Sequence, residues 1–182
     1  MANSVENVYA QALFELCCED KCAEAVFDEL GTVKEIIFSD ENQSYIELLS
    51  SPLIAAADKE NALKSVFEVK ISDLTLDFLR LLSEKERIKF LPGIYNEFKE
   101  MYYKMSNILE VTAVTSRSLS ERLKDKLVNK LETVSGKKII LSEKTDESIL
   151  GGIVLRYGNT EIDSSVKTKL EKLKKQIDGV IA

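Results

Sequence analysis

The sequence of 182 residues contains no histidine and no tryptophan. Histidine is the side chain that most readily exchanges a proton near neutral pH, so its absence excludes hydrolases built on Ser–His or Cys–His pairs. The glycine patterns that bind phosphate are also missing, because neither GxxxxGK[ST] nor GxGxxG can be written around Gly151-Gly152. We therefore expect a chain that is not an enzyme and requires no cofactor. The two glycines indicate close backbone packing instead.

Cysteine is scarce, with three residues close together at Cys17, Cys18 and Cys22. Adjacent cysteines point in different directions, and no histidine is present to complete a zinc site. The number is odd, which does not suit a framework of disulfides. We expect partly buried, reduced thiols in a reducing compartment and no structural metal.

Two prolines and seven glycines are few for this length and favour mainly helical structure with few tight turns. No apolar run approaches the roughly 20 residues that cross a bilayer. The first ten residues, MANSVENVYA, lack the basic flank and apolar core of a signal peptide. We therefore expect a chain on the cytoplasmic side of a membrane, with no direct insertion into it.

Charge is unevenly distributed along the chain. Residues 1–105 carry 11 Lys and Arg against 20 Asp and Glu, a net charge of −9, whereas residues 106–182 carry 14 against 11, a net charge of +3. Such asymmetry suggests two units with different partners, because the acidic half would repel nucleic acid and anionic lipid.

Apolar residues recur at helical spacing along six segments of the first half. Ser51-Pro52 ends the third segment, since the residue before a proline disfavours the helical conformation. Pro92 suits the first turn of the sixth, where its missing N–H is harmless. The segments predict an N-terminal six-helix bundle within residues 1–105, with helices over 4–18, 21–38, about 45–49, 56–67, 74–83 and 92–105.

The pattern changes after Ser106-Asn107, where apolar and other residues alternate over 109–114 as in a strand. Ser118 and Glu121 have the spacing of a capping box before a helix that Gly136 ends. Strands are expected over 138–141 and, buried on both faces, over 149–156. A turn at Gly158-Asn159 then leads to a short strand over 160–162 and a last helix whose N-terminus Asp163 caps. Residues 106–182 therefore predict a small C-terminal α/β domain.

The last helix is basic, and this leaves an alternative function open. A row of lysines could bind nucleic acid, as in a nucleic-acid or ribosome-associated adaptor. Against this, Glu171 lies among them and aromatic residues for stacking are absent, so a solvated helix face or an acidic protein partner also fits. The lysines are Lys167, Lys169, Lys172, Lys174 and Lys175.

Two helices of the N-terminal half are more apolar than a bundle requires. The fifth is apolar nearly all round, and Ala12 keeps one position small on the apolar face of the first. Such faces suit a groove that accepts a partner helix. The alternative is that these residues are ordinary core. The candidate binding residues are Val5, Val8, Tyr9, Ala12, Leu13, Phe78, Leu81 and Leu82.

The C-terminal stretch carries a specific pattern of glycines, charges and leucines. It comprises Gly151, Gly152, Arg156, Gly158, Asp163, Ser165, Leu170 and Leu173. With Tyr9-Ala10-x-Ala12-Leu13-Phe14, Arg87 and Leu91-Pro92, this pattern resembles the delta subunit of bacterial F-type ATP synthase, the oligomycin-sensitivity-conferring protein of mitochondria. One departure is Ser164, where the family usually has glycine; it predicts a turn that is slightly strained or differently capped.

The resemblance implies a non-catalytic stator subunit of the peripheral stalk, on the cytoplasmic side of the bacterial cell membrane. It implies that the first and fifth helices hold the N-terminal segment of an alpha subunit. It also implies that the α/β domain holds the C-terminal end of the stalk b subunit, so that proton-driven rotation is coupled to ATP synthesis. The signature residues are then expected to shape the second domain, and no nucleic acid is expected as a partner.

Overall fold

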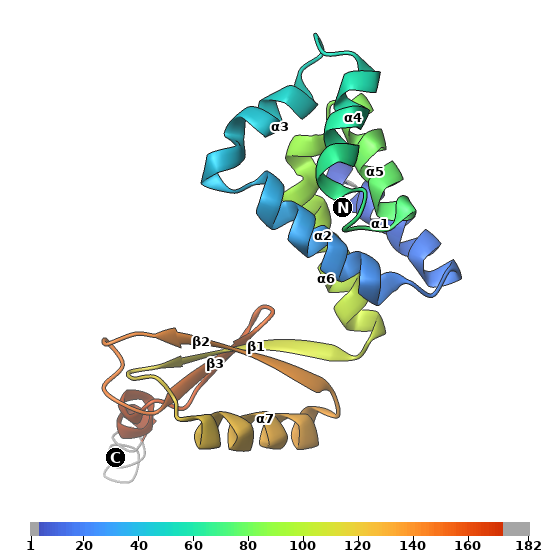
Figure 1. Ribbon diagram of the computed structural model, residues 1–182. Helices are drawn as coiled ribbons and strands as arrows, with labels where there is room; N and C mark the ends of the chain where they lie inside the picture. Colours follow the sequence, from blue (N-terminus) through green and yellow to red (C-terminus); the bar gives the residue numbers. More distant parts are fainter. Residues whose placement is uncertain (1–3, 173–182) are drawn as a thin grey trace. The chain divides into compact units, whose positions relative to one another are not determined.

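The computed structural model describes residues 4–172, which are mainly helical with one small sheet in the C-terminal part (Figure 1). The chain divides into two compact units, of which the first ends at Tyr103 and the second begins at Lys104. This agrees with the mainly α class expected from the low content of proline and glycine. None of the helices within residues 4–172 is both long and apolar enough to cross a membrane.

The first unit is built from helices that follow the predicted segments to within about two residues at most ends. Two short 3₁₀ turns, η1 (Asp40–Asn42) and η2 (Ile88–Phe90), precede α3 and α6 and were not predicted. Pro92 lies in the first turn of α6, as expected. The helices are α1 (Val5–Glu19), α2 (Ala23–Ile37), α3 (Gln43–Ser50), α4 (Ala56–Phe67), α5 (Asp73–Glu84) and α6 (Leu91–Met105).

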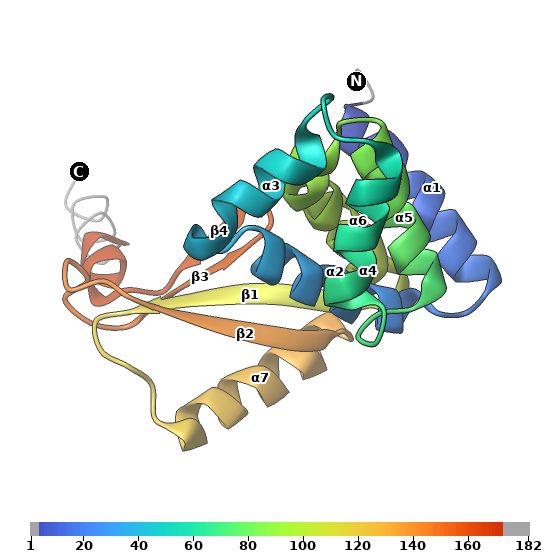
Figure 2. The same ribbon diagram turned by 45° about the horizontal axis from the view of Figure 1, so that its top comes forward.

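Local capping and aromatic contacts set how these helices pack. The Ser4 hydroxyl oxygen accepts a hydrogen bond from the Asn7 N–H at 3.2 Å and so fixes the start of α1. Phe14 of α1 meets Phe98 of α6 edge-on, with ring centroids 5.5 Å apart. Figures 1 and 2 show α5 between α1 and α4. The fully buried core includes Leu13, Leu30, Leu63, Leu79, Leu91 and Phe98.

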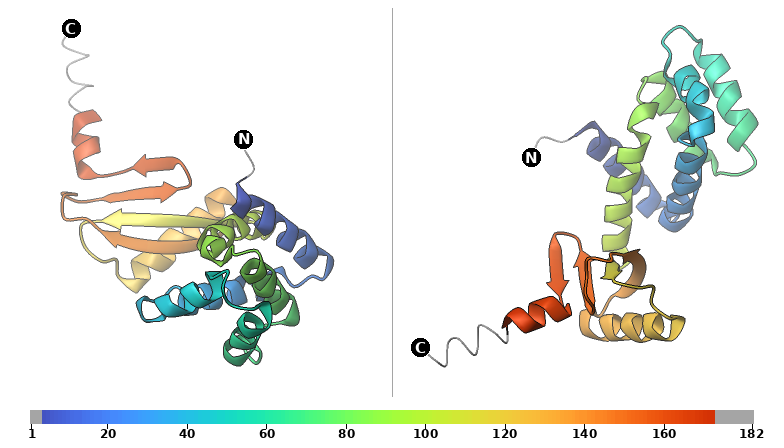
Figure 3. Two further views of the ribbon diagram at one scale, coloured as in Figure 1. Left: turned by 90° about the horizontal axis from the view of Figure 1, so that it is seen from above. Right: turned by 90° about the vertical axis from the view of Figure 1, so that its left-hand side faces the viewer.

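The second unit contains a four-stranded sheet with strand order β2-β1-β3-β4. β1 and β2 are parallel and joined through helix α7, whereas β3 pairs antiparallel with both β1 and β4. Figure 3 shows α7 along one face of the sheet. The elements are β1 (Ile108–Thr115), α7 (Glu121–Ser135), β2 (Lys138–Thr145), β3 (Ile153–Tyr157) and β4 (Thr160–Asp163).

Two local predictions in this unit were wrong. The capping box does not form, because α7 begins after Ser120 rather than Ser118, and this start places Glu121 in the first turn beside the positive end of the helix dipole. The strand predicted over 149–156 begins only at Ile153. Gly152 has φ +91°, which no extended strand adopts, and of β3 only Val154 is buried.

Candidate protein-binding groove

Helices α1 and α5 leave an open groove of about 310 Å³ on the first unit. Among the residues that line it, the carboxylate of Asp77 is the one charged group. A groove of this size and apolar character suits the apolar face of a binding partner. The lining residues are Val8, Tyr9, Ala12, Leu13 and Leu16 from α1, with Leu74, Asp77, Phe78 and Leu81 from α5.

The α1 wall exists because this helix has apolar residues on more than its core-facing side. Leu13 is buried in the core, while Val8 is 50% exposed and Leu16 is 48% exposed. Ala12 is exposed between them. Its methyl group leaves room that a longer side chain would fill. Apolar surface of this kind gains free energy when a partner covers it.

The α5 wall is held by a carboxylate from another helix. Glu29 of α2 accepts hydrogen bonds from the Ser72 N–H at 2.9 Å and from the Ser72 hydroxyl at 2.7 Å, and it also accepts one from the Thr75 hydroxyl. The Ser72 hydroxyl oxygen in turn accepts from the Thr75 N–H. Because these groups belong to the first turn of α5, Glu29 fixes where that wall of the groove begins.

A cation lies beside the aromatic part of the groove. Arg87 donates from Nη1 to the Tyr9 hydroxyl at 2.9 Å, and its guanidinium carbon is 5.4 Å from the Tyr9 ring centroid. Tyr9 also meets Phe78 edge-on across the groove, at 6.4 Å between centroids. These contacts hold the Tyr9 ring in place as part of the lining.

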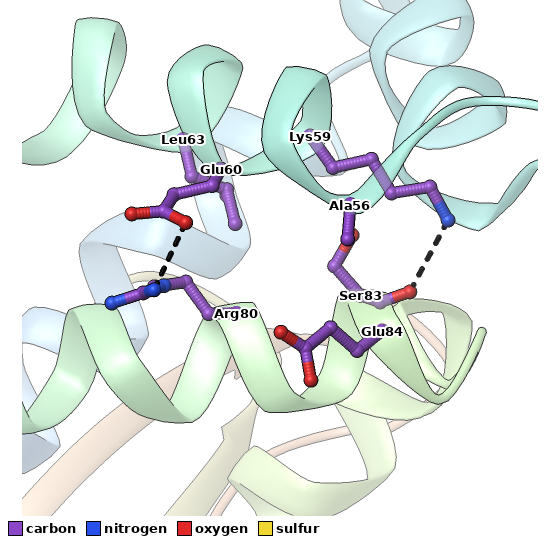
Figure 4. Close-up of a pocket in the computed structure, with 7 residues that line it drawn as sticks. All are labelled: Ala56, Lys59, Glu60, Leu63, Arg80, Ser83 and Glu84. Carbon is purple, nitrogen blue, oxygen red and sulfur yellow. Dashed lines mark hydrogen bonds and ion pairs between the residues drawn. The ribbon is translucent and has the colours of Figure 1, made fainter.

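The opposite side of α5 is tied to α4 by polar contacts (Figure 4). Arg80 pairs with Glu60 at 2.9 Å, and the buried Lys59 donates from Nζ to the Ser83 carbonyl oxygen at 3.3 Å. The pKa of Glu60 is lowered, chiefly by its hydrogen bond from Lys64 and also by Arg80. These contacts hold α5 against α4 on the side away from the groove.

Six of the eight predicted binding residues line the groove: Val8, Tyr9, Ala12, Leu13, Phe78 and Leu81. Val5 is half-buried and Leu82 is fully buried, and neither lines it. Leu16, Leu74 and Asp77 were not among the predicted site residues. Leu16 belongs to the apolar pattern of α1 and was within reach of sequence reasoning, whereas a carboxylate such as Asp77 is ordinarily assigned to solvent.

The signature residues of the second unit lie where the chain enters its last described helix, residues 166–172. A Cβ added to Gly152 would come within 2.7 Å of the Ser164 carbonyl oxygen and 2.9 Å of the Ser165 Cα. The close backbone packing predicted for this glycine is therefore confirmed. Gly158, at φ +52°, forms with Asn159 the predicted turn between β3 and β4.

Asp163 and Ser165 organise the start of that helix together. Asp163 accepts from the Ser165 N–H at 2.7 Å and from the Thr168 hydroxyl at 2.6 Å, while the Ser165 hydroxyl oxygen accepts from the Thr168 N–H at 3.3 Å. The hydrogen bond from Thr168, then those from Ser165, hold the pKa of Asp163 below its usual value. Ser165 is thus the N-cap, and the prediction that Asp163 caps this helix was wrong: Asp163 instead binds the capping residue.

Arg156 and Leu170 of the signature lie at the surface. Arg156 donates from Nε to Glu161 at 2.7 Å across the β3–β4 pair, with both side chains about half exposed. Ser164, where the resemblance led us to expect glycine, has no positive φ, and its N–H donates to the Ile153 carbonyl oxygen at 3.0 Å. The backbone at Ser164 is therefore not left-handed, and the turn shows no strain of that kind. Leu170 is exposed, and Leu173 lies outside the described residues.

Within residues 4–172, no group of three or more acidic or cysteine side chains is placed to hold a metal ion. An open apolar groove on a helical unit is the kind of surface that can accept the apolar face of a helix from another protein.

Comparison with known proteins identifies the family. The family model of the ATP synthase delta (OSCP) subunit matches residues 5–177. The ATP synthase subunit delta of Clostridioides difficile is 32% identical over 182 residues, the whole of both chains. That of Leuconostoc mesenteroides is 33% identical over 176 residues, 96% of each chain. The chain therefore belongs to the ATP synthase delta (OSCP) subunit family.

A solved structure supports the same conclusion. A chain in the cryo-EM structure of the Toxoplasma gondii mitochondrial ATP synthase hexamer matches with a TM-score of 0.69 at 26% identity, covering 96% of this chain and 97% of that chain. The family is a structural component of the peripheral stalk of F-type ATP synthase and is not itself catalytic. The resemblance read from the signature residues is confirmed.

Proposed function

We propose that this chain is the stator link between the catalytic head and the peripheral stalk of an F-type ATP synthase. The groove between α1 and α5 holds the N-terminal segment of an alpha subunit, and the unit formed by residues 106–182 holds the stalk b subunit. The link lets proton-driven rotation be coupled to ATP synthesis, on the cytoplasmic side of the bacterial cell membrane. Its partners are proteins and not nucleic acid.

The observation that carries this proposal is the uncovered apolar surface of the groove. Val8, Leu16 and Leu81 are each more than 40% exposed although all three are large and apolar. Leaving them in water costs free energy, which a partner helix recovers on binding. A stator resists torque at every turnover, so its complex should dissociate slowly. Buried apolar contacts suit this need better than charged contacts at the solvent-exposed edge of an interface. The N-terminal helices then act as one six-helix bundle under that load.

Replacement of Ala12 by arginine tests the groove directly. Ala12→Arg places a charge where the alpha segment is proposed to pack, and burying an unpaired charge is costly, so we expect affinity to fall by about 100-fold or more. Calorimetry with the full chain and a synthetic peptide of the alpha N-terminal segment measures this change.

Ala57→Arg is the matched control, because Ala57 is exposed on α4 and does not line the groove. We expect this variant to bind the peptide with the affinity of the original chain. Circular dichroism of both variants establishes that they remain folded. Unchanged affinity of Ala12→Arg would contradict the assignment of the groove.

A further inference from the structure

The corner between α1 and α2 brings two of the three cysteines together. The Asp20 N–H donates to the Leu16 carbonyl oxygen at 3.1 Å, and the Cys22 N–H donates to the Cys17 carbonyl oxygen at 3.0 Å. Lys21 between them is left-handed, with φ +56°. A left-handed residue followed by a backbone hydrogen bond that spans six residues, here from Cys22 to Cys17, is a Schellman-type helix end. In this motif the side chains of the first and last residues of the span approach each other.

The backbone bond limits how far apart the two cysteines can be. The donor nitrogen is about 1.5 Å from its own Cα and the acceptor oxygen about 2.4 Å from its own, so a 3.0 Å bond allows a Cα separation of at most about 6.9 Å. Disulfides usually span about 4.4 to 6.8 Å between Cα atoms. Besides burial, Cys22 also contributes to the raised pKa of the Cys17 thiol, as expected for two thiols close to each other. The Cα separation of the pair is therefore compatible with a disulfide.

The three thiols differ in access. Cys17 is buried, Cys22 is half-buried and Cys18 is exposed. Cys18 follows Cys17 in the helix, and successive helical side chains point about 100° apart, so Cys18 points in a different direction from Cys17.

We propose that Cys17 and Cys22 form a reversible oxidation site that a hydroperoxide converts to an intramolecular disulfide, with the more exposed Cys18 outside the bond. The site is independent of the stator role. It closes the corner where α1 ends and α2 begins, one residue after Leu16 of the groove. Oxidation then fixes the last turn of α1, which carries the end of the groove lining.

The chemistry proceeds in two steps. The Cys22 sulfur attacks one oxygen of the hydroperoxide, the O–O bond breaks, and the thiol proton ends on the departing water or alcohol, leaving a sulfenic acid. The Cys17 sulfur then attacks the Cys22 sulfur, the S–O bond breaks, and the hydroxyl leaves as water with the Cys17 proton. The two thiols are oxidised to the disulfide by two electrons, and the peroxide is reduced.

Burial sets the rate of the second step. It raises the pKa of the Cys17 thiol to about 12, so very little thiolate is present at neutral pH. We expect disulfide formation to be slow at neutral pH and faster as the pH rises. The Cys22 sulfenic acid has time to be trapped before the bond closes.

The test treats the reduced full chain with hydrogen peroxide, blocks remaining thiols with an alkylating agent and maps the products by mass spectrometry. We expect a peptide pair joined through Cys17 and Cys22, with the loss of two hydrogen atoms, and Cys18 alkylated. Dithiothreitol should restore three alkylatable thiols. The oxidised chain should also melt at a higher temperature than the reduced chain, and reduction should reverse the shift.

Two variants sharpen the test. Cys18→Ser should give the same disulfide at the same rate, whereas Cys22→Ser, a change at a half-buried position, should give no intramolecular bond. A Cys18–Cys22 bond, a dimer joined through Cys18 as the sole disulfide, over-oxidation without a disulfide, or a lower melting temperature after oxidation would each overturn the proposal. All of these readouts are independent of binding to an alpha segment.

Discussion

At the scale of single residues, the tightest constraint in the second unit is at Gly152. The residue has φ +91°, and the backbone of Ser164 and Ser165 lies against the place where a side chain would begin. The first N–H of the following helix, from Val166, donates to the neighbouring Gly151 carbonyl oxygen at 2.9 Å. The loop before β3 and the start of the helix are therefore in direct backbone contact, which any side chain at position 152 would break.

We predict that Gly152→Ala lowers the free energy of unfolding by at least about 2 kcal/mol, because backbone strain and a clash with main-chain atoms add. Urea unfolding followed by circular dichroism measures this loss. Gly158→Ala is the matched control. It also requires a positive φ, of +52°, but a Cβ there meets no atom within 4 Å, so a loss of about 1 kcal/mol is expected. Equal losses in the two variants would show that close approach is not the cause.

At the scale of elements, α5 is a wall of the groove whose position depends on groups outside it. Glu29 of α2 binds its first turn, and Arg80 and Lys59 connect the side away from the groove with α4. Its own apolar residues determine that it is a helix and that one side enters the core. The contacts at its start determine where that side lies relative to α1.

We predict that Glu29→Gln lowers the free energy of unfolding by about 1–3 kcal/mol. The glutamine NH2 group is itself a donor, so it cannot accept a hydrogen bond that Ser72 or Thr75 donates to the carboxylate. Chemical denaturation measures the loss, and hydrogen exchange of the first amides of α5 shows whether it is local. Glu35→Gln removes the same charge from an exposed position of α2 and should stay within about 0.5 kcal/mol of the original chain. If the free energy of unfolding falls equally in the two variants, the loss comes from the charge of α2 and not from the hydrogen bonds of Glu29 to the start of α5.

At the scale of the whole molecule, the distribution of charge separates the proposed function from its alternative. The first unit carries most of the negative charge, while the helix at 166–172 exposes Lys167, Lys169 and Lys172. A groove whose lining has Asp77 as its one charge would bind the proposed alpha segment chiefly by covering apolar surface. Nucleic acid bound to a row of lysines would instead depend on the release of counterions.

We predict that the affinity of the full chain for the alpha segment changes by less than about threefold between about 50 and 200 mM salt, because burial of apolar surface is little affected by screening. A complex of the chain with RNA that loses about 10³-fold in affinity over the same range would support the nucleic-acid alternative. Fluorescence anisotropy with labelled peptide and labelled RNA compares the two. A steep loss for the peptide would show that charge, and not the groove, holds it.

The sequence by itself determined the helices of the first unit, the Gly158-Asn159 turn and the need for glycine at position 152. These features depend on local spacing and on backbone angles, which neighbouring residues fix. It also determined the family, through the glycines and charges between Gly151 and Ser165.

Tertiary structure alone decided which apolar residues stay uncovered. The helical period places Leu81 and Leu82 next to each other in α5, yet Leu82 is fully buried and Leu81 is 41% exposed in the groove. The choice of Ser120 over Ser118 as the start of α7, and the shortening of β3, were decided in the same way. A periodic pattern shows which residues share a side of an element, but what covers that side depends on contacts between residues far apart in the sequence.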